Sequence, residues 1–179
     1  MPEAMRPLFL VGYMGCGKST LARKLARRLG VEAVDTDRAV EEREGATVAD
    51  IFHYEGEERF RQLEREVLEA VIARPQAAVV STGGGLPIWR DNMARMNDAG
   101  FTVYLRRSAE QIAARLSPYG RQKRPRLRGL SDGELVDFMT RDMAEREPFY
   151  AQAQCVVDCS RLSDEEAVET ILNNVKIEK

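Results

Sequence analysis

The sequence predicts a three-layer α/β fold: a parallel sheet of five strands with helices on both faces. Short β-rich runs alternate with longer segments of helical periodicity along the chain. A glycine-rich turn, GYMGCGKST, joins the first of these runs to the first helical segment. The 179 residues contain no repeat or low-complexity tract, so the length suits one compact domain with its own core.

The first elements are strongly patterned. Residues 7–11 (PLFLV) are an apolar run typical of a buried strand. A helix is expected over the segment STLARKLARRLG, in which leucines recur every four residues and Gly30 ends the helix. Residues 32–35 (EAVD) predict a second short strand. This strand–helix–strand order predicts parallel strands joined by a crossover helix.

Helical segments follow the second strand. A charged helix is expected near residues 37–44, and Thr47 can cap one or two further turns in TVADIFHYEG. The stretch from Glu57 to Ala73 is the best-patterned helix of the chain. One face of it collects apolar residues at helical spacing, namely Phe60, Leu63, Val67 and Val71.

The second half continues the alternation. The remaining strands are expected at residues 77–81, 101–105 and 155–158. Helices fit between and after them, at residues 88–98, 108–116, 131–147 and 163–176. Because helical crossovers separate the strands, we expect a parallel sheet covered on both faces. Residues 117–133 fit neither period and predict a mobile loop.

The glycine-rich turn matches the phosphate-binding loop (P-loop), Gly12-x-x-x-x-Gly17-Lys18-Ser19, in the required setting between a strand and a helix. Glycines let successive N–H groups surround an anion, and the helix adds its positive end. The alternative is a glycine-rich turn that carries Lys-Ser by coincidence. The residues expected to bind ATP here are Gly15, Cys16, Gly17, Lys18, Ser19 and Thr20. This predicts a P-loop NTPase-type fold.

Two further motifs follow predicted strands. The second strand ends in Asp-Thr-Asp, with Asp35 and Asp37, and the third is followed by Gly83-Gly84-Gly85. Ligands of parallel α/β sheets bind beyond the carboxyl ends of the strands, which is also the side of the phosphate loop. The Asn-Lys-x-Asp pattern that selects guanine is absent from the sequence, which argues against a GTPase.

In these motifs the chain resembles the shikimate kinases, within the nucleoside-monophosphate-kinase-like group. The resemblance runs in order through GYMGCGKST, DTD, ADIF, GEERFRQLE, STGGG, RPRL, REPFY and VDCS, and so covers nearly the whole chain. It implies transfer of the ATP γ-phosphate to the 3-hydroxyl of shikimate, with Mg²⁺ as cofactor. It also implies acceptor-binding helices over about residues 37–66 and a lid over about 117–130, beside a core of about 6–36, 74–113 and 150–179.

The resemblance assigns the two acids different roles. Asp37 would orient the attacking hydroxyl and accept its proton, while Asp35, with Ser19, would hold the magnesium ion. The alternative for both acids is that they only cap the following helix.

Arg61 and Arg146 match the arginines that hold the shikimate carboxylate, a task that suits the planar guanidinium. Each has a simpler alternative. Glu57 and Glu64 lie four residues before and three after Arg61, as in an exposed ion-pair ladder, and Arg146 is flanked by two glutamates.

The resemblance places other residues around the acceptor. Gly83, Gly84 and Gly85 would let the backbone pass close to the substrate ring. Phe52 and Phe60 would line its apolar side, although helical spacing also allows Phe60 to be a core residue.

Basic residues gather in the predicted lid, RQKRPRLR. The resemblance gives Arg124 the role of stabilising the transferring phosphoryl group, while Arg126 stands where the family often has an apolar residue. A solvated charge run and a nucleic-acid patch are the alternatives. No aromatic residues interleave the run, and the formal net charge is −2, so we expect no nucleic-acid partner.

Two further expectations concern the adenine end of the nucleotide and one cysteine. Arg115 and Arg161 resemble family positions that bracket adenine. Cys16 lies in the phosphate loop near Lys18, where a thiolate is favoured, which suggests the hypothesis that it is reactive and shielded by nucleotide. The alternative is a small residue at an unconstrained position.

Composition limits the remaining possibilities. Three cysteines without metal-type spacing and no secretory signal favour the cytoplasm, and no apolar run could span a bilayer. We expect a monomer whose partner is the small molecule shikimate. The alternatives are a related kinase of another hydroxy acid such as gluconate and a non-catalytic ATP-binding module.

Overall fold

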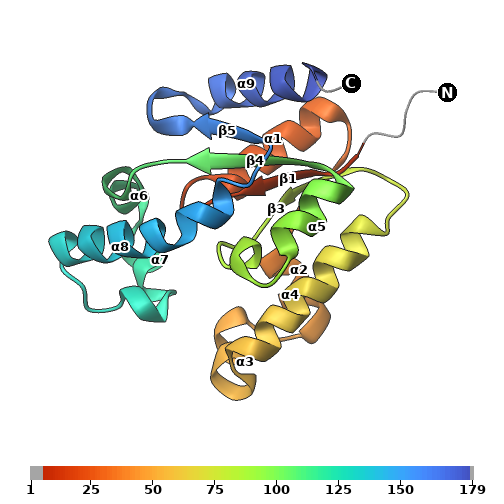
Figure 1. The fold of residues 1–179 in the computed structure, drawn as a ribbon. Helices are drawn as coiled ribbons and strands as arrows, with labels where there is room; N and C mark the ends of the chain where they lie inside the picture. The colour runs from red at the N-terminus through yellow and green to blue at the C-terminus, as the bar shows by residue number, and fades with distance from the viewer. Residues whose placement is uncertain (1–5, 178–179) are drawn as a thin grey trace.

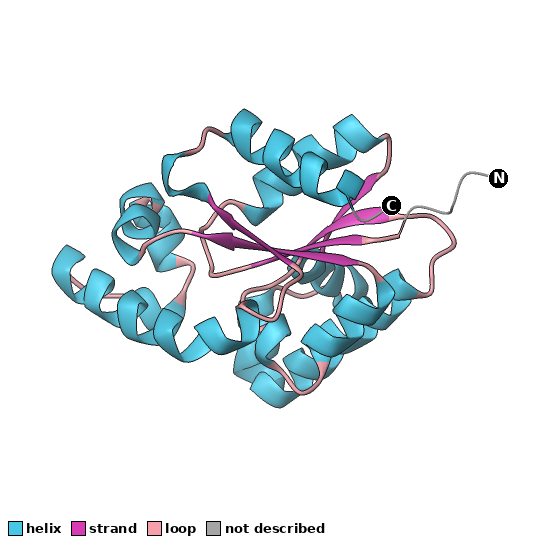
Figure 2. Cartoon of the chain, turned by 45° about the horizontal axis from the view of Figure 1, so that its top comes forward, coloured by secondary structure: helices cyan, strands magenta, loops and turns pink. Residues whose placement is uncertain are grey.

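The computed structural model describes residues 6–177, which form one five-stranded sheet between two layers of helices (Figures 1 and 2). The strands are β1 (Leu8–Val11), β2 (Glu32–Asp35), β3 (Ala78–Ser81), β4 (Phe101–Arg106) and β5 (Cys155–Asp158). Their spatial order is β2-β3-β1-β4-β5, and every neighbouring pair is parallel. The predicted α/β fold is confirmed.

Helices cover both faces of this sheet. The α-helices are α1 (Lys18–Leu29), α2 (Thr36–Glu44), α3 (Val48–Glu55), α4 (Glu57–Ile72), α5 (Asn92–Ala99), α6 (Ala109–Arg115), α7 (Pro118–Gln122), α8 (Asp132–Tyr150) and α9 (Asp164–Ile177). The 3₁₀ helices are η1 (Leu86–Ile88), η2 (Pro125–Leu127) and η3 (Cys159–Arg161). Helices α1 and α9 pack together on one face, and α4, α5 and α8 lie on the other (Figure 1).

Burial explains why the strands have these sequences. Every residue of β1 and β3 is buried, as central strands of a parallel sheet require, whereas the edge strands β2 and β5 are partly exposed. A second, smaller core lies among α2, α3 and α4, and consists of Val40, Ile51, Phe60, Leu63 and Val67. Helices α2, α3 and α4 therefore share an apolar core of their own.

The structure corrects the element boundaries at three places. The segment 117–133, expected to lack regular structure, contains α7 and η2, because Ser117 caps a turn that begins with Pro118. The helix expected at 88–98 is divided into η1 and α5. Helix α8 continues through Pro148 to Tyr150.

Thr47 caps α3 as predicted, since its side chain accepts the Asp50 N–H. The predicted apolar face of α4 is buried throughout. Within residues 6–177, no helix has the length and apolar character needed to cross a membrane.

Candidate active site

The phosphate loop leaves the sheet at the carboxyl end of β1 and turns directly into α1. Gly17 is the N-cap of α1, with φ of 103°, and no side chain caps this helix. Gly12, with φ of 146°, passes so close to β4 that an added Cβ would lie 2.7 Å from the Leu105 carbonyl oxygen. The glycine positions thus allow a tight backbone turn whose N–H groups and helix terminus can receive an anion.

The Lys18 side chain folds back onto this turn and bonds to its backbone. Its Nζ donates to the carbonyl oxygens of Gly12 and Tyr13, both at 2.8 Å, and the side chain is buried. The ammonium group is therefore held over the loop, where the outer phosphates of a nucleotide would lie.

Ser19 lies beside Asp35, at the carboxyl ends of β1 and β2. The Ser19 hydroxyl donates to Asp35 Oδ2 at 2.7 Å and lies 3.1 Å from the Ser81 hydroxyl. Asp35 Oδ1 also accepts the Arg38 N–H, so Asp35 caps α2 as the simpler alternative proposed. Hydroxyl and carboxylate oxygens suit Mg²⁺, which keeps several waters and phosphate oxygens in its shell. Among the described residues no group of three or more His, Cys, Asp or Glu forms a metal site of its own.

Asp37 has a different environment from Asp35. It lies in the first turn of α2, and its Oδ1 is buried without a hydrogen-bond partner among the described residues. Burial, followed by repulsion from Asp35, raises the pKa of the Asp37 carboxyl. Asp37 therefore does not cap α2, and its carboxylate is a stronger base than that of an ordinary aspartate.

Glu64 is the residue whose importance the sequence prediction missed. Only 1% of its surface is exposed, and Oε2 accepts from Arg61 Nη1 at 2.5 Å while Oε1 has no partner in the described chain. Burial, together with the neighbouring Asp37 carboxyl, outweighs the attraction of Arg61 and raises the Glu64 pKa to about 7. The available signal was an acid at a core position of the α4 stripe, one turn after Phe60 and next to Leu63.

Arg61 lies on the inner side of α4. It forms both ion pairs of the expected ladder, with Glu57 at 3.3 Å and with Glu64, yet its side chain is only 14% exposed. Its guanidinium also contacts the rings of Phe52 and Phe60, with 5.9 and 5.4 Å to the centroids. The exposed-ladder alternative is therefore wrong as a full description, because the guanidinium is enclosed. Phe60 is buried in the smaller core and Phe52 is partly exposed.

Arg146 comes from α8, a different helix from the one that carries Arg61. Its Nε lies 3.4 Å from Asp142 Oδ1, and its guanidinium stacks over the Tyr13 ring at 5.5 Å. The neighbouring glutamate Glu147 instead accepts the Tyr104 hydroxyl. The partner of Arg146 is thus the buried Asp142 rather than a flanking glutamate.

The triple glycine brings these groups together. A Cβ on Gly83 would lie 2.5 Å from Asp37 Oδ1 and 2.6 Å from Glu64 Oε1. One on Gly84 would lie 3.7 Å from Arg146 Nη1 and 3.4 Å from the Met14 nitrogen of the phosphate loop. One on Gly85 would overlap the Arg61 guanidinium. A side chain at any of the three glycines would therefore meet one of these groups: Asp37 and Glu64 at Gly83, Arg146 and the phosphate loop at Gly84, and Arg61 at Gly85.

Backbone hydrogen bonds fix this turn. Thr36 Oγ1 accepts the Gly83 N–H at 2.8 Å, and the Tyr150 hydroxyl donates to the Gly84 carbonyl at 2.6 Å. Thr82 binds the Leu10 carbonyl of β1 through its backbone N–H and its hydroxyl. The turn is thus held by α2, α8 and the central strand.

The lid arginines contact different partners. Arg124 Nη1 donates to the Gly120 carbonyl within the lid, at 2.8 Å. Arg126 lies 3.7 Å from Asp142 Oδ1 and 5.1 Å from the Phe138 ring. Asp142 also accepts the Tyr13 hydroxyl at 2.7 Å, so this carboxylate joins the lid, the phosphate loop and Arg146.

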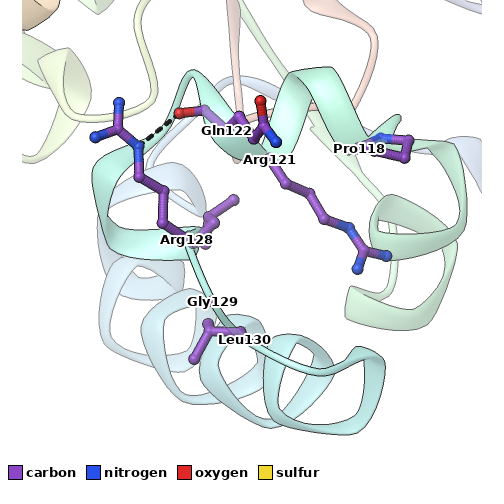
Figure 3. A pocket seen from close by; sticks show the side chains of 7 residues that line it. Pro118, Arg121, Gln122, Arg128, Gly129 and Leu130 are labelled. Carbon is purple, nitrogen blue, oxygen red and sulfur yellow. Dashed lines mark hydrogen bonds between the residues drawn. The ribbon is translucent and has the colours of Figure 1, made fainter.

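The outer part of the lid encloses a hollow of about 550 Å³, lined in part by Arg121 and Arg128 (Figure 3). Arg121 pairs with Asp132 at 2.6 Å, and Arg128 donates to the Gln122 carbonyl at 2.7 Å. Arg128 is thus engaged within the lid and Arg121 with the start of α8, and among the described residues neither contacts those gathered at the triple glycine.

The expected adenine residues lie in two segments. A Cβ on Gly17 would lie 3.6 Å from Arg115 Nη2, so Arg115 borders the phosphate loop. Arg161 is exposed at the end of η3. Arg107 is another residue that the sequence prediction missed: it is buried and bonds to the carbonyls of Cys16 and Cys159.

Cys16 does not have the environment expected of a reactive thiol. It has no exposed surface, and its Sγ lies 3.8 Å from Lys18 Nζ inside the main core. Because an alkylating reagent cannot reach a fully buried thiol, the hypothesis of a reactive Cys16 is wrong for this structure.

Known proteins resemble the chain over nearly its whole length. A family model for shikimate kinase matches residues 14–176. The shikimate kinase of Bacteroides thetaiotaomicron is 41% identical over 169 residues, which cover 94% of this chain and 95% of that protein.

Solved structures agree with this match. A crystal structure of the Bacteroides thetaiotaomicron shikimate kinase superposes with a TM-score of 0.88 at 40% identity, and the match covers 97% of this chain and 99% of that one. The Acinetobacter baumannii shikimate kinase in complex with shikimate gives a TM-score of 0.86 at 31% identity, with 99% and 96% covered.

The gluconate alternative finds only a distant counterpart. A gluconokinase from Sinorhizobium meliloti superposes over 96% of this chain and 91% of its own, with a TM-score of 0.58 and 15% identity. Similarity at this level shows a shared fold and nothing about the acceptor.

Proposed function

Since the chain belongs to the shikimate kinase family and phosphorylates shikimate with ATP, we propose how its residues divide this reaction between them. The nucleotide's phosphates bind the loop from Gly12 to Thr20, and shikimate binds in front of the triple glycine. The surroundings of Gly84 carry this proposal: a Cβ built there would lie 3.4 Å from the Met14 nitrogen and 3.7 Å from Arg146 Nη1, which supports an acceptor site beside the phosphate loop.

The magnesium ion would be held by Ser19 and Asp35, together with phosphate oxygens and water. Their hydrogen bond of 2.7 Å supports this, since both oxygens already lie at one point of the loop's rim. When bound, the ion neutralises charge on the phosphate oxygens. Lys18 adds a second positive charge from inside the loop.

Asp37 orients the 3-hydroxyl of shikimate and accepts its proton. The hydroxyl oxygen forms a bond to the γ-phosphorus, the bond from that phosphorus to the bridging oxygen of ADP breaks, and the proton passes to Asp37. The buried Oδ1 without a protein partner supports this role, because a substrate hydroxyl can supply the missing hydrogen bond. The raised pKa also brings Asp37 closer to the range of an effective base.

Arg61 and Arg146 bind the shikimate carboxylate from two sides of the turn. Both side chains are largely enclosed, so an incoming carboxylate would pair with them away from bulk water. Ion pairs are stronger in such a low-dielectric environment than in water. Phe52 and Phe60 support the Arg61 guanidinium through their rings, and Phe52 borders the apolar side of the acceptor.

The lid, about residues 117–130, closes over the phosphates and excludes water. Arg124 then stabilises the transferring phosphoryl group. The 3.7 Å pair of Arg126 with the buried Asp142 supports the choice of Arg124 over Arg126 for this role. Arg115 and Arg161 border the adenine, and Arg115 already lies beside Gly17.

The chain works as one domain, with the core, the acceptor region over about 37–66 and the lid as its parts. We infer that it acts as a monomer in the cytoplasm, because the residues assigned to both substrates all come from one chain. The odd number of cysteines supports a reducing compartment.

A coupled assay of ADP release tests the proposal, with shikimate, gluconate or no acceptor. We expect ADP release that depends on shikimate and is at the no-acceptor level with gluconate. Equal release in all three reactions would contradict the assigned function, and preference for gluconate would contradict the assigned acceptor.

A further inference from the structure

Arg107 is a buried cation that the reaction described above does not use. It follows the last residue of β4 and is 7% exposed, whereas its neighbour Arg106 points outward and pairs with Asp158 at 3.3 Å. Adjacent side chains of a strand alternate between faces, so only the second of the two arginines enters the interior.

Sheet order explains what surrounds Arg107. Strand β4 lies between β1 and β5, and Arg106 is in register with Asp158. The residue after β4 therefore lies between the residues that follow β1, which form the phosphate loop, and those that follow β5, which form η3. Figure 1 shows the three strands side by side.

The guanidinium bonds to both of these segments. Nε donates to the Cys16 carbonyl at 3.0 Å, and Nη1 donates to the Cys159 carbonyl at 2.9 Å. Gln111 of α6 adds a bond to the next carbonyl of η3, that of Ser160, at 2.9 Å. Thus one rigid, forked side chain joins the phosphate loop to the segment that ends in Arg161.

The bond to Cys16 also sets the direction of a loop N–H. A peptide unit is planar and trans, so its C=O and N–H point in opposite directions. Because the Cys16 carbonyl points to Arg107, the Gly17 N–H of the same peptide points away from Arg107. A phosphate loop needs its N–H groups turned inward and its carbonyls turned outward.

The charge of Arg107 is not balanced by an ion pair. Within residues 6–177, no carboxylate lies within salt-bridge distance of it. A buried cation held only by carbonyl dipoles is unfavourable without a nearby anion, so it favours an anion in the adjoining loop.

We propose that Arg107 is a positioning residue of the nucleotide site: it turns the Cys16 carbonyl out of the phosphate loop and fixes η3 against that loop. The inference rests on the proposed binding of ATP phosphates to the loop. It assigns Arg107 to the nucleotide and not to shikimate, because both of its bonds are made on the nucleotide side.

Three variants test this inference. Arg107→Met removes the charge and both hydrogen bonds but leaves a long, unbranched side chain. Arg107→Lys keeps the charge but has one donor nitrogen in place of the guanidinium fork. Arg106→Met is the matched control, because Arg106 points outward. ADP and pyrophosphate binding are measured by calorimetry without shikimate. The KM values for ATP and shikimate and the melting temperature are measured alongside.

We expect Arg107→Met to weaken ADP and pyrophosphate binding and to raise the KM for ATP by about tenfold or more, with the KM for shikimate changed less than about twofold. Arg107→Lys should recover part of this loss, because its ammonium restores the charge but cannot reproduce the fork. Arg106→Met should match the wild type.

Unchanged nucleotide binding in Arg107→Met would overturn the inference, and so would a parallel rise of both KM values, which indicates a general structural role. If Arg107→Met does not fold, Arg107→Lys decides, since wild-type ADP affinity in that variant would exclude a need for the fork. Lys18→Met separates the two proposals. Undiminished ADP binding there would contradict the placement of the phosphates, whereas a loss there without a loss in Arg107 variants would contradict only the role of Arg107.

Discussion

The two halves of the candidate active site differ in the groups that form them: one consists mainly of backbone groups and the other of side chains. The proposed nucleotide half is a run of consecutive residues, Gly12 to Thr20, whose backbone and helix terminus would receive the anion. The acceptor half gathers side chains from α2, α4 and α8 around one turn after β3. In the proposed function each half would bind an anionic group, one mainly with backbone dipoles and the other with two guanidinium groups.

This difference has an energetic consequence. The acceptor half keeps two buried carboxyl oxygens, Asp37 Oδ1 and Glu64 Oε1, without partners in the described chain. Each such group destabilises a folded protein by about 1–3 kcal/mol. We interpret these two oxygens as hydrogen-bond acceptors that the bound acceptor substrate would satisfy. In the phosphate loop, the corresponding groups are backbone N–H donors.

The lid should produce the largest effect, since Arg124 is assigned to the phosphoryl group that passes between the halves. We expect Arg124→Ala to lower kcat on the order of 10³-fold, as loss of a comparable arginine does in other phosphotransferases. Arg128→Ala is the matched control, because Arg128 bonds to Gln122 in the outer lid, and it should change kcat less than about twofold. Steady-state kinetics measure both, and similar losses at the two positions would show that Arg124 is misassigned.

Asp37→Asn tests the acceptor half with almost no change of shape. We expect kcat to fall on the order of 10²-fold because the amide cannot accept the proton. Shikimate and ATP should still bind, as calorimetry can establish. Asp98→Asn, on the exposed face of α5, is the control. A full-rate Asp37→Asn enzyme would remove the proposed base from the mechanism.

Gly85→Ala tests whether the turn must touch Arg61. The added Cβ would overlap the guanidinium and displace it, so we expect the KM for shikimate to rise by about 10–100-fold while the KM for ATP stays nearly constant. Gly133→Ala is the control, because a Cβ there meets nothing within 4 Å. An unchanged KM for shikimate in Gly85→Ala would show that the contact has no role in binding.

A smaller effect is expected on the pH dependence of stability, to which the acceptor half contributes through Glu64. Because burial raises the Glu64 pKa from 4.5 to about 7, the folded protein binds more protons than the unfolded chain between these values. The contribution of Glu64 to the free energy of unfolding is therefore present below about pH 4.5 and is lost as the pH rises through about 7.

Glu64→Gln should remove this dependence. We expect the difference in unfolding free energy between wild type and variant to change by on the order of 1–3 kcal/mol between pH 4.5 and 7.5, favouring the wild type more at the acidic end. Urea unfolding at each pH measures it. A difference that is constant with pH would contradict the raised pKa.

The two halves also differ in how far the sequence predicts them. The phosphate loop, the strand ends and the buried face of α4 follow from local patterns, and the structure has them where the patterns predict. Asp37 and Arg61 required the family resemblance, since spacing alone also allows a helix cap and an exposed ladder.

Glu64, Arg107 and Asp142 could not be assigned in this way. Glu64 lies three residues from Arg61 and has the spacing of an exposed pair, while its burial is set by the packing of α4 against the glycine turn. Arg107 depends on sheet order, which brings the ends of three strands together. Asp142 bonds to Tyr13, a residue far away in sequence. The contacts of Arg107 and Asp142 have no local pattern, and for Glu64 the local signal is limited to its place on the apolar stripe of α4.

The central claim is that Arg61 and Arg146 bind the carboxylate of the acceptor. The direct test compares kcat/KM for shikimate with that for its methyl ester, which lacks the charge, in the wild type and in Arg146→Met. We predict that the wild type prefers shikimate by on the order of 10²-fold or more and that the variant loses most of this preference. An equal preference in both enzymes would contradict the claim.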